Sequence, residues 1–130
     1  MNKGNVTLAL LLLPALLATS ACGAEKITLN CSGTQSSPNS SDQPITSFSL
    51  VIDQQEKAVT PLREGVSMGR TFPIVEQTDS VVRFRLVAED GQTVVGVIDR
   101  VSGLTTVSSS SAGTVLWTYN LKCERAKPIF

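Results

Sequence analysis

The sequence predicts an all-β fold, a small antiparallel meander barrel of seven or eight strands, with a β-sandwich as the alternative. Three observations lead to this prediction. Past residue 24 no apolar repeat with helical spacing occurs, and short runs rich in Val, Ile, Thr and Phe recur instead. Tight turns join almost all of these runs, which favours a meander. The first and last runs each carry a cysteine on the apolar side, which would hold the edges of a closed barrel together.

The N-terminal segment, residues 1–24, predicts a signal for export. One lysine precedes an apolar run of about a dozen residues, and small residues follow this run. The run is too short to span a hydrocarbon core of about 30 Å as a permanent helix. Residues 25–130 are then expected to form a single β domain in the periplasm or at the outer membrane.

Two processing routes fit the end of this segment. Signal peptidase I requires small residues one and three positions before the cut; Cys22 and Ala24 would supply them, and the mature chain would begin at Glu25. The alternative is a lipobox, the stretch TSAC, in which Cys22 becomes the lipid anchor of an outer-membrane lipoprotein. Both routes remove Cys22 from thiol chemistry. The remaining pair, Cys31 and Cys123, is expected to form a disulfide bond in an oxidising compartment.

The first strands are predicted from alternating side chains. Residues 27–32 and 47–53 alternate apolar and polar residues, as a strand with one buried face does. The polar stretch 33–44 between them contains two prolines and is expected to be a loop. Residues 58–62 and 72–76 are shorter runs of strand-forming residues, and the glycine-containing stretch between them is expected to be a loop.

The clearest hairpin lies in the second half of the chain. In residues 81–88 the apolar side chains at every second position from Val82 onward share one face, and the two arginines share the other. The Asp-Gly pair that follows predicts a two-residue type I′ turn, because glycine accepts the positive φ that this turn requires. This turn would place Phe84 opposite Val97, and Arg85 opposite Gly96.

The last strands are predicted at residues 104–108 and 114–123. In the second of these, every second residue from Val115 to Cys123 is apolar, and these residues are expected to share one inward face. Trp117 and Tyr119 belong to this face. They would line a ligand cavity or form part of an ordinary barrel core, since small barrels show both kinds of interior.

Composition excludes several kinds of chemistry. The chain has no histidine, so it has neither a Ser-His-Asp triad nor an imidazole metal ligand. With the cysteines paired or processed there is no thiolate nucleophile, and no glycine-rich phosphate loop occurs. The serine-rich stretches 36–41 and 108–111 have no neighbouring lysine in a catalytic motif and are expected to be solvated loops. We therefore expect no enzyme, no cofactor and no metal.

Charge limits the partners. Eleven basic and eleven acidic residues balance to a formal charge of zero, which offers no long-range field toward nucleic acid or an anionic membrane. Contact with a membrane would therefore depend on a lipid on Cys22. The outward Arg83 and Arg85 would bind an anion or an acidic partner, or would only keep that face solvated. We expect a monomer whose partner is another protein or a small ligand.

Three segments carry a resemblance to known proteins. They are ITLNCSGT near the start, GVIDRVSG in the middle and YNLKCERAKPIF at the end. These segments resemble a group of small exported bacterial proteins of unknown function, which begin with a Cys-Ser-Gly-Thr strand and end with Cys, two residues, Ala-Lys-Pro and an aromatic. More loosely, the layout with cysteines in the first and last strands resembles small lysozyme-inhibitor lipoproteins with compact barrel folds.

Three functions follow as expectations. The first is an exported, non-enzymatic protein of the cell envelope with a binding or structural role. The second, implied by the looser resemblance, is an inhibitor of a lysozyme-type enzyme in the periplasm that acts through its loops. The third is a carrier that holds a small apolar ligand inside the barrel near Trp117.

Overall fold

The computed structural model describes residue 4 and residues 26–127. The predictions for the export segment, and for Cys22 as a lipid anchor, lie outside the described residues. Nowhere in the described part of the chain is there a helix that would cross a membrane. The strands are β1 (Lys26–Ser37), β2 (Ser40–Asp53), β3 (Ala58–Arg63), β4 (Val66–Ser67), β5 (Phe72–Gln77), β6 (Val81–Val87), β7 (Gln92–Asp99), β8 (Leu104–Ser111) and β9 (Thr114–Arg125).

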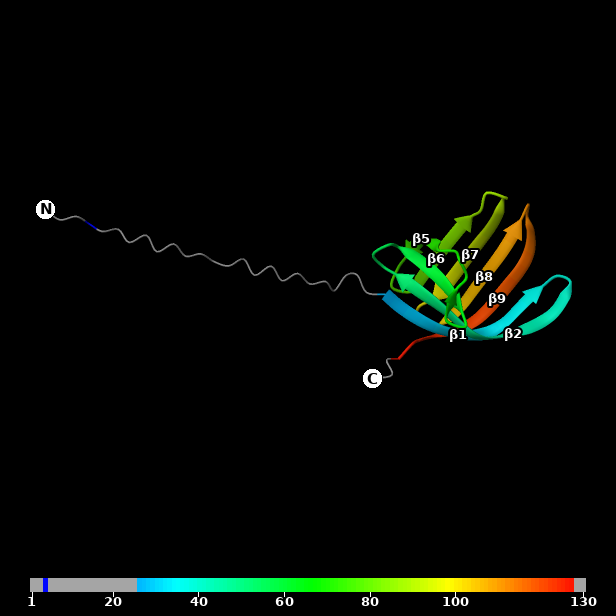
Figure 1. Cartoon of the computed structure of the whole chain (residues 1–130), viewed down its shortest axis with the longest axis horizontal. Helices are drawn as coiled ribbons and strands as arrows, with labels where there is room; N and C mark the ends of the chain where they lie inside the picture. Colours follow the sequence, from blue (N-terminus) through cyan, green and yellow to red (C-terminus); the bar gives the residue numbers. More distant parts are fainter. Residues whose placement is uncertain (1–3, 5–25, 128–130) are drawn as a thin grey trace.

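These strands close into an antiparallel meander barrel (Figure 1). Apart from β4 and β5, strands adjacent in sequence are paired; β5 instead pairs with β3, and β9 pairs with β1 to complete the ring. β4 has only two residues and pairs with β3 alone, so the other eight of the nine strands form the closed ring. The predicted all-β meander barrel is confirmed, and the chain does not adopt the sandwich.

The core consists of the inward residues of all the long strands. Phe84 and Val59 are fully buried, and Leu50 is 1% exposed. The rings of Phe72 and Phe84 stack with their centroids 5.5 Å apart, and Phe48 meets Tyr119 edge to face at 5.6 Å. Such ring pairs add to the stability that the buried apolar area provides.

The register of the β6–β7 hairpin differs from the prediction by one residue. The connection has three residues: the Ala88 N–H donates to the Gln92 carbonyl at 2.8 Å, and Gly91 adopts φ +83°. This is the three-residue alternative to the type I′ turn, a type I turn followed by a left-handed residue. Phe84 therefore lies opposite Gly96 instead of Val97. A Cβ at Gly96 would lie 1.9 Å from Cζ of Phe84, so this glycine makes room for the ring.

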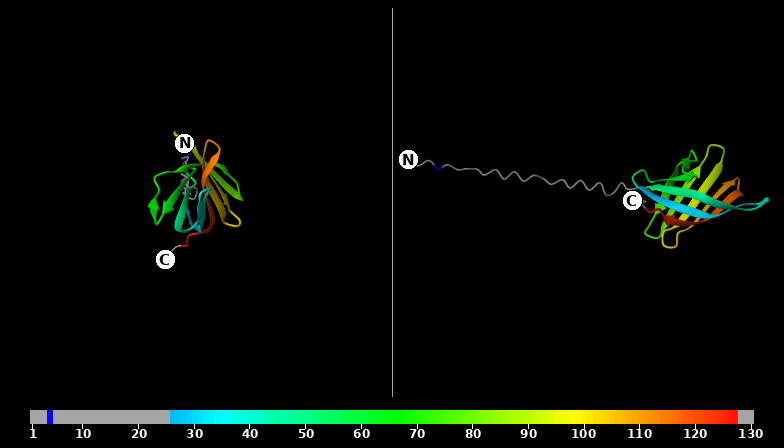
Figure 2. Two further views of the ribbon diagram at one scale, coloured as in Figure 1. Left: turned by 90° about the vertical axis from the view of Figure 1, so that its right-hand side faces the viewer. Right: turned by 60° about the horizontal axis from the view of Figure 1, so that its bottom comes forward.

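The polar stretch 33–44, predicted to be a loop, forms most of a long hairpin between β1 and β2. The pairs include Thr34 with Pro44 and Gln35 with Gln43. The prediction was wrong because the stretch has no apolar alternation, and its strand state comes from partners distant in the sequence. The first part of the stretch also pairs with β9 on its other side. In Figure 2 the hairpin extends past the other strands.

The serine-rich stretch 108–111 was predicted to be a solvated loop, and this prediction was wrong, because the stretch is the end of β8. Ser109 is fully buried. A bulge sets Ser109 opposite Trp117 and Ser110 opposite Val115, which interrupts the alternation of β9. Val115 is consequently 47% exposed, against the prediction that it faces inward.

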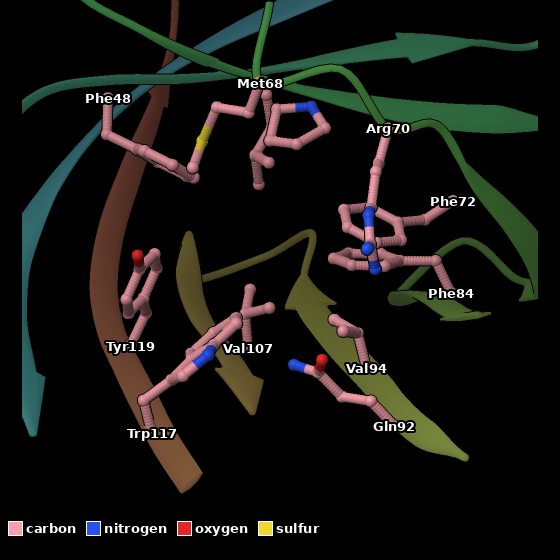
Figure 3. Close-up of a pocket in the computed structure, with 12 residues that line it drawn as sticks. Phe48, Met68, Arg70, Phe72, Phe84, Gln92, Val94, Val107, Trp117 and Tyr119 are labelled. Atoms are coloured by element: carbon pink, nitrogen blue, oxygen red, sulfur yellow. The ribbon is translucent and has the colours of Figure 1, made fainter. Parts of the chain in front are cut away.

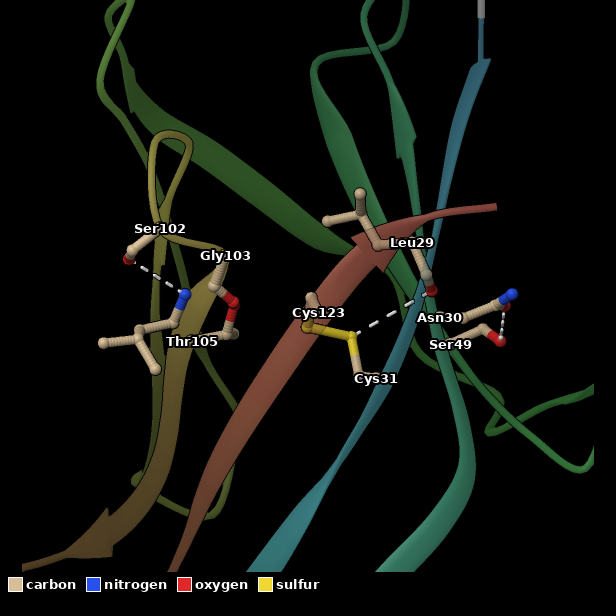
Figure 4. The surroundings of a disulfide bond; sticks show 9 residues. Leu29, Asn30, Cys31, Ser49, Ser102, Gly103, Thr105 and Cys123 are labelled. Carbon is tan, nitrogen blue, oxygen red and sulfur yellow. Dashed lines mark hydrogen bonds between the residues drawn. A yellow bond between two sulfur atoms is a disulfide. The ribbon is translucent and has the colours of Figure 1, made fainter. Parts of the chain in front are cut away.

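The predicted disulfide bond between Cys31 and Cys123 is confirmed. The two residues are direct partners in the β1–β9 ladder, with their Cα atoms 4.0 Å apart. Both side chains are buried, as the alternation of their strands predicted. Figure 4 shows the bond between the two strands, beside the turn that contains Gly103. The bond joins the edges at which the meander closes.

Candidate functional site

The interior of the barrel is hollow at one end. The cavity has a volume of about 250 Å³ and lies at the end that carries the β6–β7 and β8–β9 turns, which we call the cavity end (Figure 3). We call the other end, where the disulfide lies near the β7–β8 turn, the disulfide end. The cavity is lined by Phe48, Leu50, Pro61, Met68, Arg70, Phe72, Phe84, Gln92, Val94, Val107, Trp117 and Tyr119.

Aromatic rings form two sides of this cavity. Phe72 and Phe84 lie on one side, and Trp117 and Tyr119 lie on the other (Figure 3). The rings of Trp117 and Tyr119 are 4.5 Å apart between centroids. The structure thus brings the two residues singled out in the sequence to the cavity wall. That they contact a ligand remains a prediction.

A polar pair interrupts the apolar wall. Gln92, the first residue of β7, donates a hydrogen bond from its side-chain amide to the hydroxyl of buried Ser109 in β8. This bond supplies the partner that a buried hydroxyl needs. Sequence reasoning missed Gln92 because the predicted register of β7 was shifted by one residue. With the observed register, Gln92 shares the inward face with Val94 and Gly96.

One rim of the cavity is the connection from β4 to β5. Met68 is 43% exposed, Arg70 is also exposed, and both line the cavity. The connection is tied to β3 by two hydrogen bonds: the Met68 N–H donates to the Pro61 carbonyl at 3.2 Å, and the hydroxyls of Thr60 and Thr71 are 3.2 Å apart. No periodicity in the sequence marks this glycine-containing segment, so nothing there pointed to Met68 or Arg70.

The other two candidate arginines lie elsewhere. Arg83 and Arg85 project from the outer face of β6, and neither lines the cavity. Nε of Arg83 is 3.3 Å from Oε1 of Glu76, so its charge already has a partner. The structure does not bring these arginines together with Arg70. Their contact with an anion or an acidic partner stays a prediction.

The local environment of Asp99 lowers the pKa of its side chain. Backbone N–H groups of Ser102 and Val101 donate to its carboxylate at 3.0 and 2.9 Å, and these hydrogen bonds lower the pKa. The carboxylate thereby holds the β7–β8 turn at the disulfide end. Its position in a turn and its local partners indicate a structural role.

A second depression lies at the disulfide end and has a volume of about 450 Å³. Its walls combine isoleucine and leucine side chains with acidic and basic residues, and its described lining residues include none of the aromatic rings that surround the cavity at the other end. Among the residues that the structure describes, no three His, Cys, Asp or Glu side chains gather as metal ligands would.

Comparison with known protein families, with curated proteins and with solved structures finds no match for this chain.

Proposed function

We propose that this protein is an exported, non-enzymatic barrel that binds a small apolar molecule in the cavity at its cavity end. The observation that carries the proposal is the cavity of about 250 Å³ with aromatic rings on two sides. An apolar cavity of about 150 Å³ in another protein is enough to bind benzene. The cavity therefore has room for an apolar body larger than one benzene ring.

The architecture supports this proposal. Eight-stranded barrels are wide enough either to be filled by side chains or to hold one small ligand. Here the aromatic residues are gathered around a space instead of filling it. An apolar ligand would leave water for this space, and each square ångström of apolar surface removed from water contributes about 25 cal/mol.

The disulfide supports the proposed location outside the cytoplasm. Bonds of this kind persist in oxidising compartments such as the bacterial periplasm. We therefore propose the periplasm or the outer membrane, where a lipid on Cys22 would anchor the barrel. A mass measurement on the purified mature protein distinguishes an acylated Cys22 from a chain that begins at Glu25.

The cavity is tested by titrating the protein with 1-octanol, a neutral apolar probe. Trp117 is the only tryptophan of the chain, so its fluorescence reports on the cavity without interference. We expect a saturable change in its intensity or wavelength. Val94→Phe should abolish this change, because Val94 is 4% exposed and lines the cavity, which the larger ring would fill.

The matched control is Val95→Phe. Val95 is the next residue of the same strand, points outward and is 38% exposed. This variant should bind 1-octanol as the unmodified protein does. An unsaturable signal, or equal binding by Val94→Phe and Val95→Phe, would contradict the proposal.

A second candidate function is inhibition of a lysozyme-type enzyme. It is favoured by the long polar hairpin of β1 and β2, which extends past the other strands with an exposed turn at Pro38 and Asn39 (Figure 2). Such a hairpin would reach into the cleft of an enzyme. Lysozyme activity in the presence of excess purified protein tests this candidate, and unchanged activity counts against it.

A further inference from the structure

The cavity has one charged group at its rim. Among the described residues that line the cavity, Arg70 alone is charged. In the described part of the chain, ion pairs join Lys26 to Asp53 and Arg83 to Glu76, and neither involves Arg70. No hydrogen bond of its guanidinium to another described residue is found either. Its positive charge, at the edge of an apolar space, therefore has no partner in the described part of the chain.

We propose that the ligand is an anion, a small monocarboxylate with an apolar body, and that Arg70 binds its carboxylate. This inference rests on the proposed function, because it assigns a chemical class to the molecule in the same cavity. A guanidinium presents several N–H donors in a planar fork that matches the two oxygens of a carboxylate. The attraction between opposite charges is also stronger beside an apolar wall than in bulk water.

The position of Arg70 determines the orientation of this ligand. Arg70 and Met68 belong to the exposed rim, whereas Trp117, Tyr119 and Phe84 belong to the wall of the space within the barrel. In Figure 3 the Arg70 side chain lies on the same side of this space as Phe72 and Phe84, and its guanidinium is drawn over their rings. The carboxylate would therefore remain at the rim, in contact with solvent, while the apolar body enters the barrel. This arrangement avoids burying a charge away from water.

The residues around Arg70 favour a negatively charged ligand over a positively charged one. The described residues that line the cavity include no acidic side chain, so a cation would find no partner among them. The other polar groups of the lining side chains are uncharged: the amide of Gln92 is bonded to Ser109, and Tyr119 and Trp117 contribute a hydroxyl and an indole N–H. A neutral apolar molecule would use the rings but would leave Arg70 without a role.

The test compares octanoate with octanamide, which has nearly the same shape and no charge, by isothermal titration calorimetry at pH 7. We expect octanoate to bind about tenfold more tightly than octanamide. Arg70→Gln should abolish this difference, because it should weaken the binding of octanoate much more than that of uncharged octanamide. Arg70→Lys should retain part of the preference, because it keeps the charge and loses the planar fork.

Two controls accompany this test. Arg85→Gln removes an exposed arginine on the outer face of the barrel and should leave the preference intact. Thermal unfolding of Arg70→Gln should match that of the unmodified protein, since Arg70 is exposed and has no partner among the described residues. The same pair of measurements with 3-phenylpropanoate and its amide distinguishes an aromatic acid from a fatty acid as the source of the carboxylate.

Each outcome decides between the two proposals. Equal binding of octanoate and octanamide to the unmodified protein would overturn the anion proposal and leave the apolar site standing. A preference that survives in Arg70→Gln would also overturn the assignment to Arg70. If none of the acids and amides binds, the proposed function fails, and this inference fails with it.

Discussion

The two ends of the barrel are built differently. At the disulfide end, β1 and β9 are joined by their ladder and by the bond between Cys31 and Cys123. The Cys123 N–H also donates to the Gly103 carbonyl at 2.8 Å, which ties the β7–β8 turn to β9. At the cavity end the wall is interrupted. β3 and β5 pair only at Ala58–Pro73 and Val59–Phe72, and residues 64–71, which connect these two strands, lie outside the ring.

This difference indicates that the two ends of the barrel have different roles, one in stability and the other in binding. Covalent and ladder contacts at the disulfide end stabilise the closed ring. The other end can then remain hollow, with its rim made by a connection instead of a strand. Changes at the disulfide end should therefore affect mainly stability, and changes at the cavity end should affect mainly binding.

The largest expected effect is the loss of the disulfide. Cys31→Ser opens a loop closed across a sequence separation of 92 residues. The chain-entropy account of disulfides predicts a decrease of about 4–5 kcal/mol in the free energy of unfolding. Urea unfolding of the variant, and of the unmodified protein with and without a reducing agent, measures this decrease. An unchanged unfolding curve in both cases would show that the disulfide end does not depend on its bond.

A smaller effect is expected from removing an apolar side chain, and its size should depend on the end. Leu121 is 3% exposed and lies two residues before Cys123, so Leu121→Ala should decrease the free energy of unfolding by about 2–5 kcal/mol. Met68 is 43% exposed at the cavity rim, and Met68→Ala should cost less than about 1 kcal/mol. Chemical denaturation measures the loss of unfolding free energy in both variants. Equal losses would contradict the proposed difference between the two ends.

The smallest expected effect depends on pH. Because hydrogen bonds from Ser102 and Val101 lower the pKa of Asp99 below its usual 3.8, the folded state binds a proton here less readily than the unfolded state does. The resulting stabilisation is present above about pH 4 and is lost as the pH falls through the lowered pKa. Asp99→Asn should therefore lose stability relative to the unmodified protein above pH 4, and the two unfolding curves should converge at lower pH.

A matched change at the cavity end provides the control for Asp99. Asp90 holds the β6–β7 turn by accepting a hydrogen bond from the Gln92 N–H at 2.9 Å. Asp90→Asn should change the stability less than Asp99→Asn, since the Asp99 carboxylate accepts hydrogen bonds from two backbone groups. The reverse order, measured by thermal unfolding near neutral pH, would argue against a specially stabilised disulfide end.

Short-range patterns were enough to predict the fold class and the disulfide. Alternation at period two identified the buried faces of β6 and of the later part of β9, and it placed both cysteines on buried faces. The same reasoning failed for the start of β2, where no apolar alternation exists and pairing with β1 decides the structure. It failed for the register of β7 because one turn sequence is compatible with loops of two lengths.

Only part of the candidate site was predicted, because the sequence indicates where a side chain points only in a strand that alternates clearly. Trp117 and Tyr119 were singled out because their strand alternates clearly. Gln92 required the correct register, and Arg70 lies in a connection without any periodic pattern. The sequence by itself determined that the chain forms a β-barrel and that Cys31 and Cys123 are available to join its edges, because alternation and cysteine number are local properties. Only the tertiary structure decided where the barrel is hollow and which charge lies at its rim, because that space is enclosed by residues from many strands at once.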